Sequence, residues 1–330
     1  MNKVPKVRRI IQIPSIISNE TPCDVEITED QRRKIEENPF TLLPGTGRTV
    51  DTGLPIPEDL PENRLIIFSG GYNCGSTAKK NIESIHNQNY KNFIHVIVND
   101  ASKDATDSVI KYYLPTYGYR MRYYKNPKNV GLLQNMVNYI KPNIKSYQDI
   151  ILIVDFDDWL PDADVFKTIN YYYQKYNYWL TYGSYRAIID GNIRKHKGKS
   201  KGQDVPIYSK ETRMHRRDFR AMAWMFYPIR TFKAFLWLNV DPEDLKGPAG
   251  TYRISGGDRA YGYPLLELTP GDKIGNIPDV LYTYNSDSPL CDHRIHSKEQ
   301  SEMKRWFSKK PRYTALDINY PNTLGEYNER

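Results

Sequence analysis

Aspartates gather behind a short apolar run in the middle of the chain. The run 150–154 is entirely apolar, and it is followed by Asp155, Asp157, Asp158, Asp162 and Asp164. If the run is a strand that continues through residue 157, Asp155 and Asp157 project from one face, about 6.5–7 Å apart. Two bare carboxylates there repel each other by about 2.5 kcal/mol at an effective dielectric constant of 20. Oxygen ligands on a short segment suit Mg²⁺ or Mn²⁺, which also bind phosphate oxygens and water.

Capping offers a simpler interpretation of some of these aspartates. Aspartate often precedes a helix, because its side chain accepts hydrogen bonds from the first backbone N–H groups. We therefore interpret Asp158, Asp162 and Asp164 as helix-start or solvated residues. Asp155 and Asp157 come directly off the apolar run, so they are the candidates for a functional role.

Strands and helices are expected to alternate around this motif. Apolar runs predict strands at 64–70, 92–100, 119–126 and 149–155. Helical spacing of apolar residues predicts helices at 76–88, 104–114, 131–140 and 162–176. The alternation predicts an α/β fold with a mainly parallel, Rossmann-like sheet and helices on both faces. Ligands bind such sheets at the carboxyl ends of the strands.

The pattern changes after residue 180 to a smaller mixed region. We expect a strand that turns at Asp190-Gly191, short helices at 228–238 and 256–268, and a strand at 279–285. The last forty residues, 291–330, look polar and irregular. The Pro-rich stretch 1–62 is predicted to be an extended arm around the core, with disorder as the alternative.

Charge and cysteine content limit the partners and the compartment. The chain has 330 residues and a net charge of +8. The segment 194–220 holds ten basic and three acidic residues, a net of +7. It predicts a local contact with an anionic partner, with a solvated charge run as the alternative. Nucleic acid is not expected, because aromatic residues are not interleaved there.

Three widely separated cysteines, Cys23, Cys74 and Cys291, match no metal spacing. Their low, odd number favours a reducing compartment such as the cytoplasm. No apolar run reaches the roughly 18 residues that span a bilayer, so we expect a soluble protein without a transmembrane segment.

The segment 68–110 resembles the opening of family 2 glycosyltransferases, which are nucleotide-sugar enzymes of the GT-A fold. The motifs that carry the resemblance are SIHNQNYKNF at 84–93, NDASKDAT at 99–106, NPKNVGLLQN at 126–135 and DFDDWL at 155–160. The resemblance is clear over about 64–180 and weaker to about 295. It implies a GT-A domain at 63–295, with a nucleotide-sugar half (63–180) and an acceptor half (181–295). The remainder is an N-terminal extension (1–62) and a C-terminal tail (296–330).

The resemblance also implies roles for single residues. Asp100 would contact the nucleotide base, expected to be uracil, and the Tyr72-Asn73 loop would line the same pocket. Further residues expected near the nucleotide are Asn129, Gly131 and Asn135. Asp155 would hold the ribose or the metal, and Asp157 would ligate a divalent cation. The family often has two acids where this chain has Asn99-Asp100.

The catalytic base is expected in the second half. Asp258, at a glycine-rich helix start, would accept the proton of the acceptor hydroxyl as that oxygen attacks the anomeric carbon. The alternative is that Asp258 only caps the helix. Many GT-A enzymes also supply a C-terminal histidine to the metal, and this chain offers His293 first and His296 second.

The resemblance implies metal-dependent, inverting transfer of a sugar from a nucleotide donor, expected to be a UDP-sugar, by a hexosyltransferase-type enzyme with Mn²⁺ or Mg²⁺. The acceptor would be a glycan, a lipid-linked group or a protein. The basic segment 194–220 would close over the donor diphosphate or contact an anionic acceptor. Trp224, Phe226 and Tyr227 would line the acceptor side or pack in the core. Two other functions stay open. The first is a catalytically inactive nucleotide-sugar-binding protein. The second is a haloacid-dehalogenase-like phosphatase, a class that also has a strand–Asp-x-Asp motif, but this chain has Trp159 where that class has a different residue.

Overall fold

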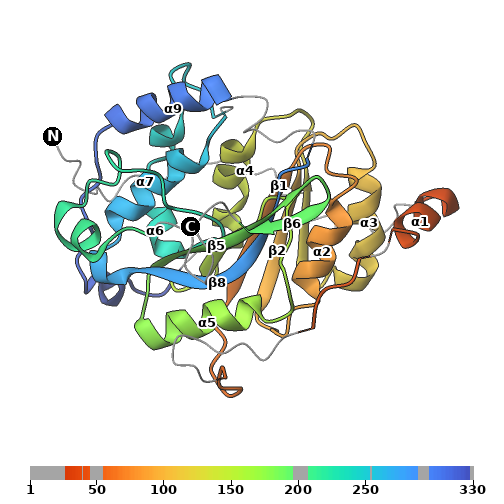
Figure 1. Cartoon of the computed structure of the whole chain (residues 1–330), viewed down its shortest axis with the longest axis horizontal. Helices are drawn as coiled ribbons and strands as arrows, with labels where there is room; N and C mark the ends of the chain where they lie inside the picture. Colours follow the sequence, from red (N-terminus) through yellow and green to blue (C-terminus); the bar gives the residue numbers. More distant parts are fainter. Residues whose placement is uncertain are drawn as a thin grey trace.

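One twisted sheet organises the molecule (Figure 1), with the strand order β3-β2-β1-β4-β7-β5-β6 and with β8 paired to β5. The structure is a computed structural model that describes residues 27–38, 40–44, 55–195, 207–252, 255–288 and 297–327. The strands are β1 Leu65–Gly71, β2 Phe93–Asn99, β3 Met121–Lys125, β4 Ile150–Ile153, β5 Leu180–Ile189, β6 Asn192–Lys195, β7 Arg230–Lys233 and β8 Ile274–Asn285. The first four strands are parallel.

Helices cover both faces of this sheet. They are α1 Glu29–Glu36, α2 Ala78–His86, α3 Thr106–Tyr117, α4 Leu132–Tyr139, α5 Val165–Tyr176, α6 Ala234–Leu238, α7 Asp258–Leu268 and α9 Ser297–Lys309. Short helical turns lie at Lys141–Asn143, Thr212–Arg216, Pro242–Leu245, Gly271–Lys273 and Tyr320–Thr323. The predicted α/β fold, with its parallel sheet in the first half, is confirmed.

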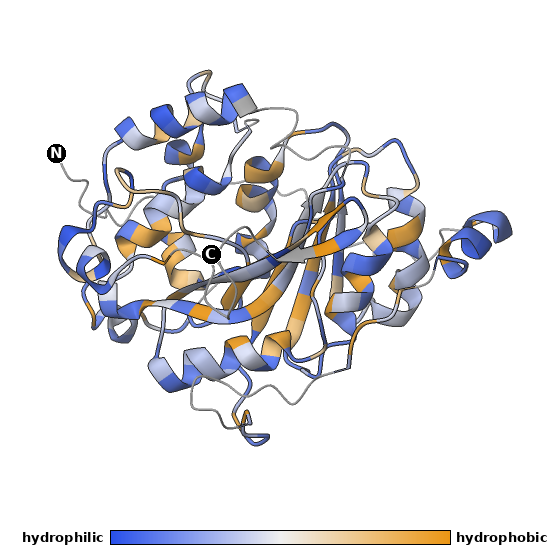
Figure 2. Ribbon diagram, in the orientation of Figure 1, coloured by the Kyte–Doolittle hydropathy of each residue, from blue (hydrophilic) through white to orange (hydrophobic). Residues whose placement is uncertain are grey.

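The two faces of the central strands bury different partners. In β1, Ile66 and Phe68 pack with α4, α6 and α7, whereas Leu65 and Ile67 pack with α5. This follows from the period of two in a strand, which sends successive side chains to opposite faces. Both faces are covered, so the strands are apolar throughout rather than alternating. Figure 2 shows the most hydrophobic residues on these central strands.

The second half confirms some expected elements and corrects others. The Asp190-Gly191 turn connects β5 to β6, with φ values of +52° and +70°. The segment 228–238, predicted to be a helix, instead contains β7 followed directly by α6. The tail, predicted to be irregular, contains α9. The N-terminal stretch contains α1, which begins with a capping box between Thr28 and Gln31.

Arginines of the basic segment fix the C-terminal end of α7. Arg217 donates through Nη2 to three backbone carbonyls, those of Leu266, Glu267 and Thr269, at 2.8–3.2 Å. Arg213 donates to the carbonyls of Gly271 and Ile274. The last carbonyls of a helix lack partners within the helix, so these contacts stabilise its end. Part of the local positive charge therefore has a structural role.

Arg220 forms a buried ion pair with Glu267, a residue of α7. Its Nε and Nη2 donate to the two carboxylate oxygens at 2.6 and 2.8 Å, and both side chains are 3% exposed. Further hydrogen bonds from Arg220 reach carbonyls at the end of α9 and just after it, at Phe307, Lys310 and Pro311. Every polar atom of the pair thus finds a partner, as a buried charge pair requires.

Several expectations fall outside the residues that the structure describes. These are the histidines His293 and His296, the cysteines Cys23 and Cys291, and the part of the basic segment at 196–206. Among the helices described, none is both long and apolar enough to cross a membrane.

His86 of α2 and His95 of β2 form a pair of buried histidines. His95 Nε2 lies 3.0 Å from Ser69 Oγ, and its Nδ1 lies 3.3 Å from His86 Nε2. Burial lowers the pKa of His86 to about 3, with a further contribution from Arg120. Burial also lowers the pKa of His95 well below its usual value, and the neighbouring His86 adds to this. Both rings are therefore neutral in the folded chain at neutral pH.

We predict that acid destabilises the fold through these histidines. The unfolded chain binds protons near pH 6.5, whereas the folded chain resists protonation, so stability is complete above pH 6.5 and falls as the pH drops toward 3. The resistance of each histidine to protonation in the folded chain should lower the free energy of unfolding by about 2 kcal/mol at pH 5. Urea unfolding at pH 7, 6 and 5 should show that the free energy of unfolding falls less steeply with pH in His86→Gln than in the parent chain. The exposed His215→Gln is the control, and equal slopes in both variants would contradict the assignment.

Candidate active site

Four loops meet at the carboxyl edge of the parallel strands. They follow β1, β2, β3 and β4, and span residues 72–75, 100–105, 126–131 and 154–158. The register brings the first three starting points level, because Gly71 is opposite Asn99 and Asn99 is opposite Lys125. β4 ends slightly earlier, with Ile153 opposite Phe68. The loops hold the two predicted metal-binding aspartates and the predicted nucleotide-site residues of this half, except Asn135, which lies in α4.

The loop after β1 is joined to the loop after β2. The Asn73 N–H donates to Ser102 Oγ at 2.9 Å, and Asn73 Oδ1 accepts from the Lys103 N–H at 2.8 Å. Asn73 and Ala101 both have positive φ, +54° and +64°. That conformation is costly for alanine and is tolerated by asparagine. The half-buried Tyr72 precedes this junction, so its backbone position is fixed on both sides.

Asp100 organises the loop after β3. Its buried carboxylate accepts from the N–H groups of Val130 and Gly131, at 3.0 and 2.8 Å, and from Asn126 Nδ2 at 2.7 Å. The same Asn126 amide donates to Asn135 Oδ1 at 2.7 Å. Gly131 precedes α4 with a φ of +87°, a conformation that favours glycine.

Asp100 thus serves a loop-shaping role that the sequence did not indicate. Its contact with a nucleotide base stays a prediction, as do the contacts expected of Asn129, Gly131 and Asn135. Asn129 is half-buried, whereas Asn135 is almost fully buried. Asn126 is a member of this network that sequence reasoning missed, although it stands first in the motif NPKNVGLLQN.

The aspartate motif forms a tight turn rather than a strand. β4 ends at Ile153, and the Asp158 N–H donates to the Asp155 carbonyl at 2.9 Å. The expectation that a strand carries Asp155 and Asp157 on one face is therefore wrong. Both residues are half-buried in this turn. A turn lets several carboxylates lie close together, which a pleated strand does not.

Asp158 is part of the core rather than a helix-start residue. Its carboxylate accepts from Tyr282 Oη and from the Asn285 N–H, each at 2.7 Å. It is 1% exposed, so the capping interpretation of Asp158 is wrong. Asp164 does directly precede α5, but its side chain makes no capping bond and accepts from Asn89 instead.

Two further side chains hold this turn in place. Tyr282 Oη, on β8, accepts from the Asp155 N–H at 3.1 Å. Asn81 Nδ2, on α2, donates to the carbonyls of Asp155 and Asp158 at 3.1 and 2.9 Å. The turn is thus fixed by one helix that precedes it and one strand that follows it by more than a hundred residues.

The electrostatics of the turn favour a bound cation. Burial, followed by the charges of Asp157 and Asp155, raises the pKa of Asp158 well above its usual value. Burial raises the pKa of the Cys74 thiol, and Asp157 adds to this. The neighbouring groups therefore experience excess negative charge, and a hard divalent cation fits the oxygen donors of Asp155 and Asp157. Within the described ranges, no three His, Cys, Asp or Glu residues gather as a metal site.

Asp258 is the first residue of α7, as predicted, and it faces an arginine. Arg230 Nη2 lies 3.4 Å from Asp258 Oδ2. Arg230 begins β7, where it is opposite Ile153, the last residue of β4. This register places Asp258 beside the end of β4, near the aspartate turn. Sequence reasoning missed Arg230 because the segment that contains it was interpreted as a helix.

The aromatic residues expected on the acceptor side divide into two groups. Phe226 is fully buried and belongs to the core, as the packing alternative predicted. Trp224 is half-buried and lies against α7, where a Cβ at Gly262 would meet its ring at 2.5 Å. Tyr227 is half-buried beside Tyr185. Only Trp224 and Tyr227 keep exposed surface that a ligand could contact.

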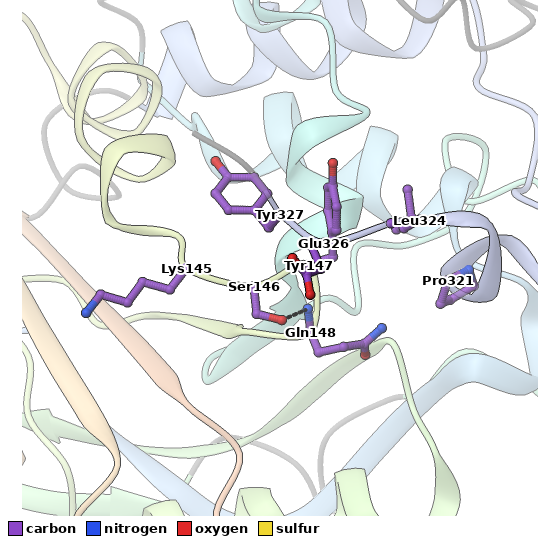
Figure 3. Close-up of a pocket in the computed structure, with 9 residues that line it drawn as sticks. Lys145, Ser146, Tyr147, Gln148, Pro321, Leu324, Glu326 and Tyr327 are labelled. Carbon is purple, nitrogen blue, oxygen red and sulfur yellow. Dashed lines mark hydrogen bonds between the residues drawn. The ribbon is translucent and has the colours of Figure 1, made fainter. Parts of the chain in front are cut away.

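A separate hollow of about 470 Å³ lies away from these residues. Figure 3 shows that it opens between the segment 145–148 and the C-terminal segment 321–327. Because 145–148 directly precedes β4, this hollow lies at the amino edge of the sheet. It is therefore opposite the aspartate turn.

The fold and the site together define a glycosyltransferase of the GT-A class. Solved structures of S. aureus TarS share the fold. TarS 1–349 has a TM-score of 0.50 and is 15% identical, over 68% of this chain and 60% of that one. The same protein in complex with UDP-GlcNAc has a TM-score of 0.52, over 68% of this chain and 58% of that one.

The chain belongs to glycosyl transferase family 2, whose family model matches residues 71–236. A curated relative is the Bacillus subtilis (strain 168) protein described as "Putative glycosyltransferase EpsE", which is 34% identical over 73 residues. That match covers 22% of this chain and 26% of the relative. The chain thus spans about a quarter of this relative.

We predict that Asp100→Asn loosens the loop at 126–131. The amide has one oxygen in place of two, so at least one of the Val130 and Gly131 N–H groups loses its acceptor or meets another donor. A buried donor without a partner costs about 1–3 kcal/mol. Urea unfolding should show this loss, whereas Asp59→Asn, at an exposed position, should stay within about 0.5 kcal/mol of the parent. Equal stability of the two variants would argue against the loop-shaping role.

Proposed function

We propose that this chain transfers a sugar from a nucleotide donor, a UDP-sugar, to an acceptor hydroxyl, with inversion at the anomeric carbon. One observation carries the proposal: the end of β4, from which the aspartate turn follows, and Asp258 at the start of α7 both lie next to Arg230. A carboxylate pair for the donor diphosphate and a separate carboxylate for the acceptor are the two parts that a single displacement needs.

The loops of the first half would bind the nucleotide. We assign the base to the pocket of Asp100 and the Tyr72-Asn73 loop, and the rest of the nucleoside to the residues Asn129, Gly131, Asn135 and Asp155. The hydrogen bonds within and between the loops support this assignment, because they organise the pocket before ligand arrives. The choice of uracil is supported by the TarS fold, solved with UDP-GlcNAc.

Asp155 and Asp157 would hold Mn²⁺ or Mg²⁺, with His293 as the proposed third ligand. When bound, the cation would act as a Lewis acid that screens the charge on the departing diphosphate. Two half-buried carboxylates leave coordination positions for phosphate oxygens and water, as these ions prefer. The turn is held by Asn81 and Tyr282, so the two carboxylates keep their relative position.

The chemical step would be one displacement. The acceptor oxygen forms a bond to the anomeric carbon while the bond from that carbon to the diphosphate oxygen breaks. Asp258 takes the hydroxyl proton, and the electron pair of the broken bond leaves with the nucleoside diphosphate. Attack on one face with departure from the other inverts the centre. The acceptor would be a hydroxyl of a glycan, a lipid-linked group or a protein.

Nucleotide binding is the first test. We predict that a UDP-sugar with Mn²⁺ raises the melting temperature, and that the shift falls when EDTA replaces the metal. A ligand at 100 times its dissociation constant stabilises a protein by about 2.7 kcal/mol. A panel that includes GDP-sugars and free UDP controls for base specificity. Equal shifts with and without metal would contradict the metal site.

Turnover is the second test, and it separates an enzyme from an inactive binding protein. We predict that Asp157→Ala and Asp258→Asn each reduce transfer by at least about a hundredfold, because each removes a group that acts in the transition state. Asp258→Asn should keep its nucleotide-induced thermal shift, whereas Asp157→Ala should lose the metal-dependent part. Release of nucleoside diphosphate measures turnover, and the exposed Asp59→Ala is the control. Full activity of Asp258→Asn would exclude it as the base.

A further inference from the structure

Arg230 has three separate anchors in the space between β4 and α7. Its Nε donates to the Phe226 carbonyl at 2.8 Å, and its Nη1 donates to Tyr261 Oη at 3.2 Å. Its Nη2 reaches Asp258 Oδ2 at 3.4 Å. The side chain is only 12% exposed. A guanidinium held in this way has little freedom to change its direction.

The charge of Arg230 is kept despite its burial. Burial alone would lower its pKa, but Tyr261, Asp258 and Asp155 raise the pKa above its ordinary value. Tyr282 adds to the same effect. These groups come from α7, from the aspartate turn and from β8, so Arg230 lies in the field of both parts of the site. The positive charge of the Arg230 guanidinium therefore acts on both the donor side and the acceptor side of the proposed site.

Helix α7 carries a second arginine–carboxylate pair that serves as a comparison. Arg220 and Glu267 make two short bonds, and both side chains are 3% exposed. The Arg230–Asp258 contact is single and longer, and the Asp258 side chain is 25% exposed. Among the described residues, no hydrogen bond to Asp258 Oδ1 is found. The first pair is closed and structural, whereas the second leaves one carboxylate oxygen accessible.

We propose that Arg230 is the positioning residue for Asp258: it turns Oδ2 toward the sheet, leaves Oδ1 for the acceptor hydroxyl, and fixes the carboxylate relative to the aspartate turn. This inference rests on the proposed function, in which Asp258 is the base. Small displacements of a reacting group cost large factors in rate, so this fixation matters for turnover.

The test compares Arg230→Gln and Arg230→Lys, using the nucleotide sugar that gives the largest thermal shift and following release of nucleoside diphosphate. Arg230→Gln should reduce kcat by about ten- to a hundredfold, with KM for the donor within about threefold. Arg230→Lys keeps the charge but not the planar fork of donors, so it should also lose kcat, by a smaller factor than Arg230→Gln.

Arg217→Lys is the matched control, because it alters an arginine at the other end of α7 whose hydrogen bonds all go to backbone carbonyls. It should reduce stability while leaving kcat unchanged. Urea unfolding verifies that each variant is folded, and Arg230→Lys decides the matter if Arg230→Gln does not fold. A wild-type kcat in a folded Arg230 variant would overturn the inference.

The double variant separates this inference from the proposed function. If Asp258 is the base and Arg230 acts through it, adding Arg230→Lys to Asp258→Asn should cause no further loss of turnover. If Asp258→Asn is itself fully active, the proposed base is wrong. A third outcome is that Asp258→Asn is impaired and that Arg230→Lys lowers the remaining turnover of this variant by the same factor as it lowers turnover of the parent. Arg230 would then act independently of Asp258, and the positioning role would be wrong.

Discussion

The common edge at which four parallel strands end is the constraint on which the candidate site depends. β1 pairs with β2 as far as Gly71 and Asn99, and with β4 as far as Phe68 and Ile153. Backbone hydrogen bonds fix this register, so loops that are far apart in the chain start at fixed relative positions. Side-chain bonds then join neighbouring loops, and Asp100 provides the most extensive of these connections.

The carboxylates at this edge differ in what surrounds them. Asp100 is buried and is satisfied by backbone N–H groups and the Asn126 amide, and Asp158 is buried against Tyr282. Both shape the loops that surround the proposed ligand. Asp155 and Asp157 are half-buried, and Asp258 keeps a quarter of its side chain exposed. Partial exposure beside fixed neighbours is what a group needs to bind an ion or accept a proton.

Local patterns in the sequence predicted much of the first half of the fold and of the site. Strands and helices up to residue 176 follow from apolar runs and helical spacing, and both the aspartate motif and the helix start at Asp258 were recognisable. The misses concern partners distant in sequence. Tyr282 contacts Asp158 across 124 positions, and no local pattern indicates such a pair. β7 has four residues and leads directly into α6, so it is too short to show its own period.

Tyr282 has a consequence for the two halves of the domain. Its hydroxyl accepts from the Asp155 N–H and donates to the Asp158 carboxylate, although it belongs to β8 in the second half. A fragment that ended at residue 180 would contain every aspartate of the turn but neither Tyr282 nor Arg230. The negative charges would remain without the groups that orient and compensate them. The geometry of the aspartate turn therefore depends on residues from both halves of the chain.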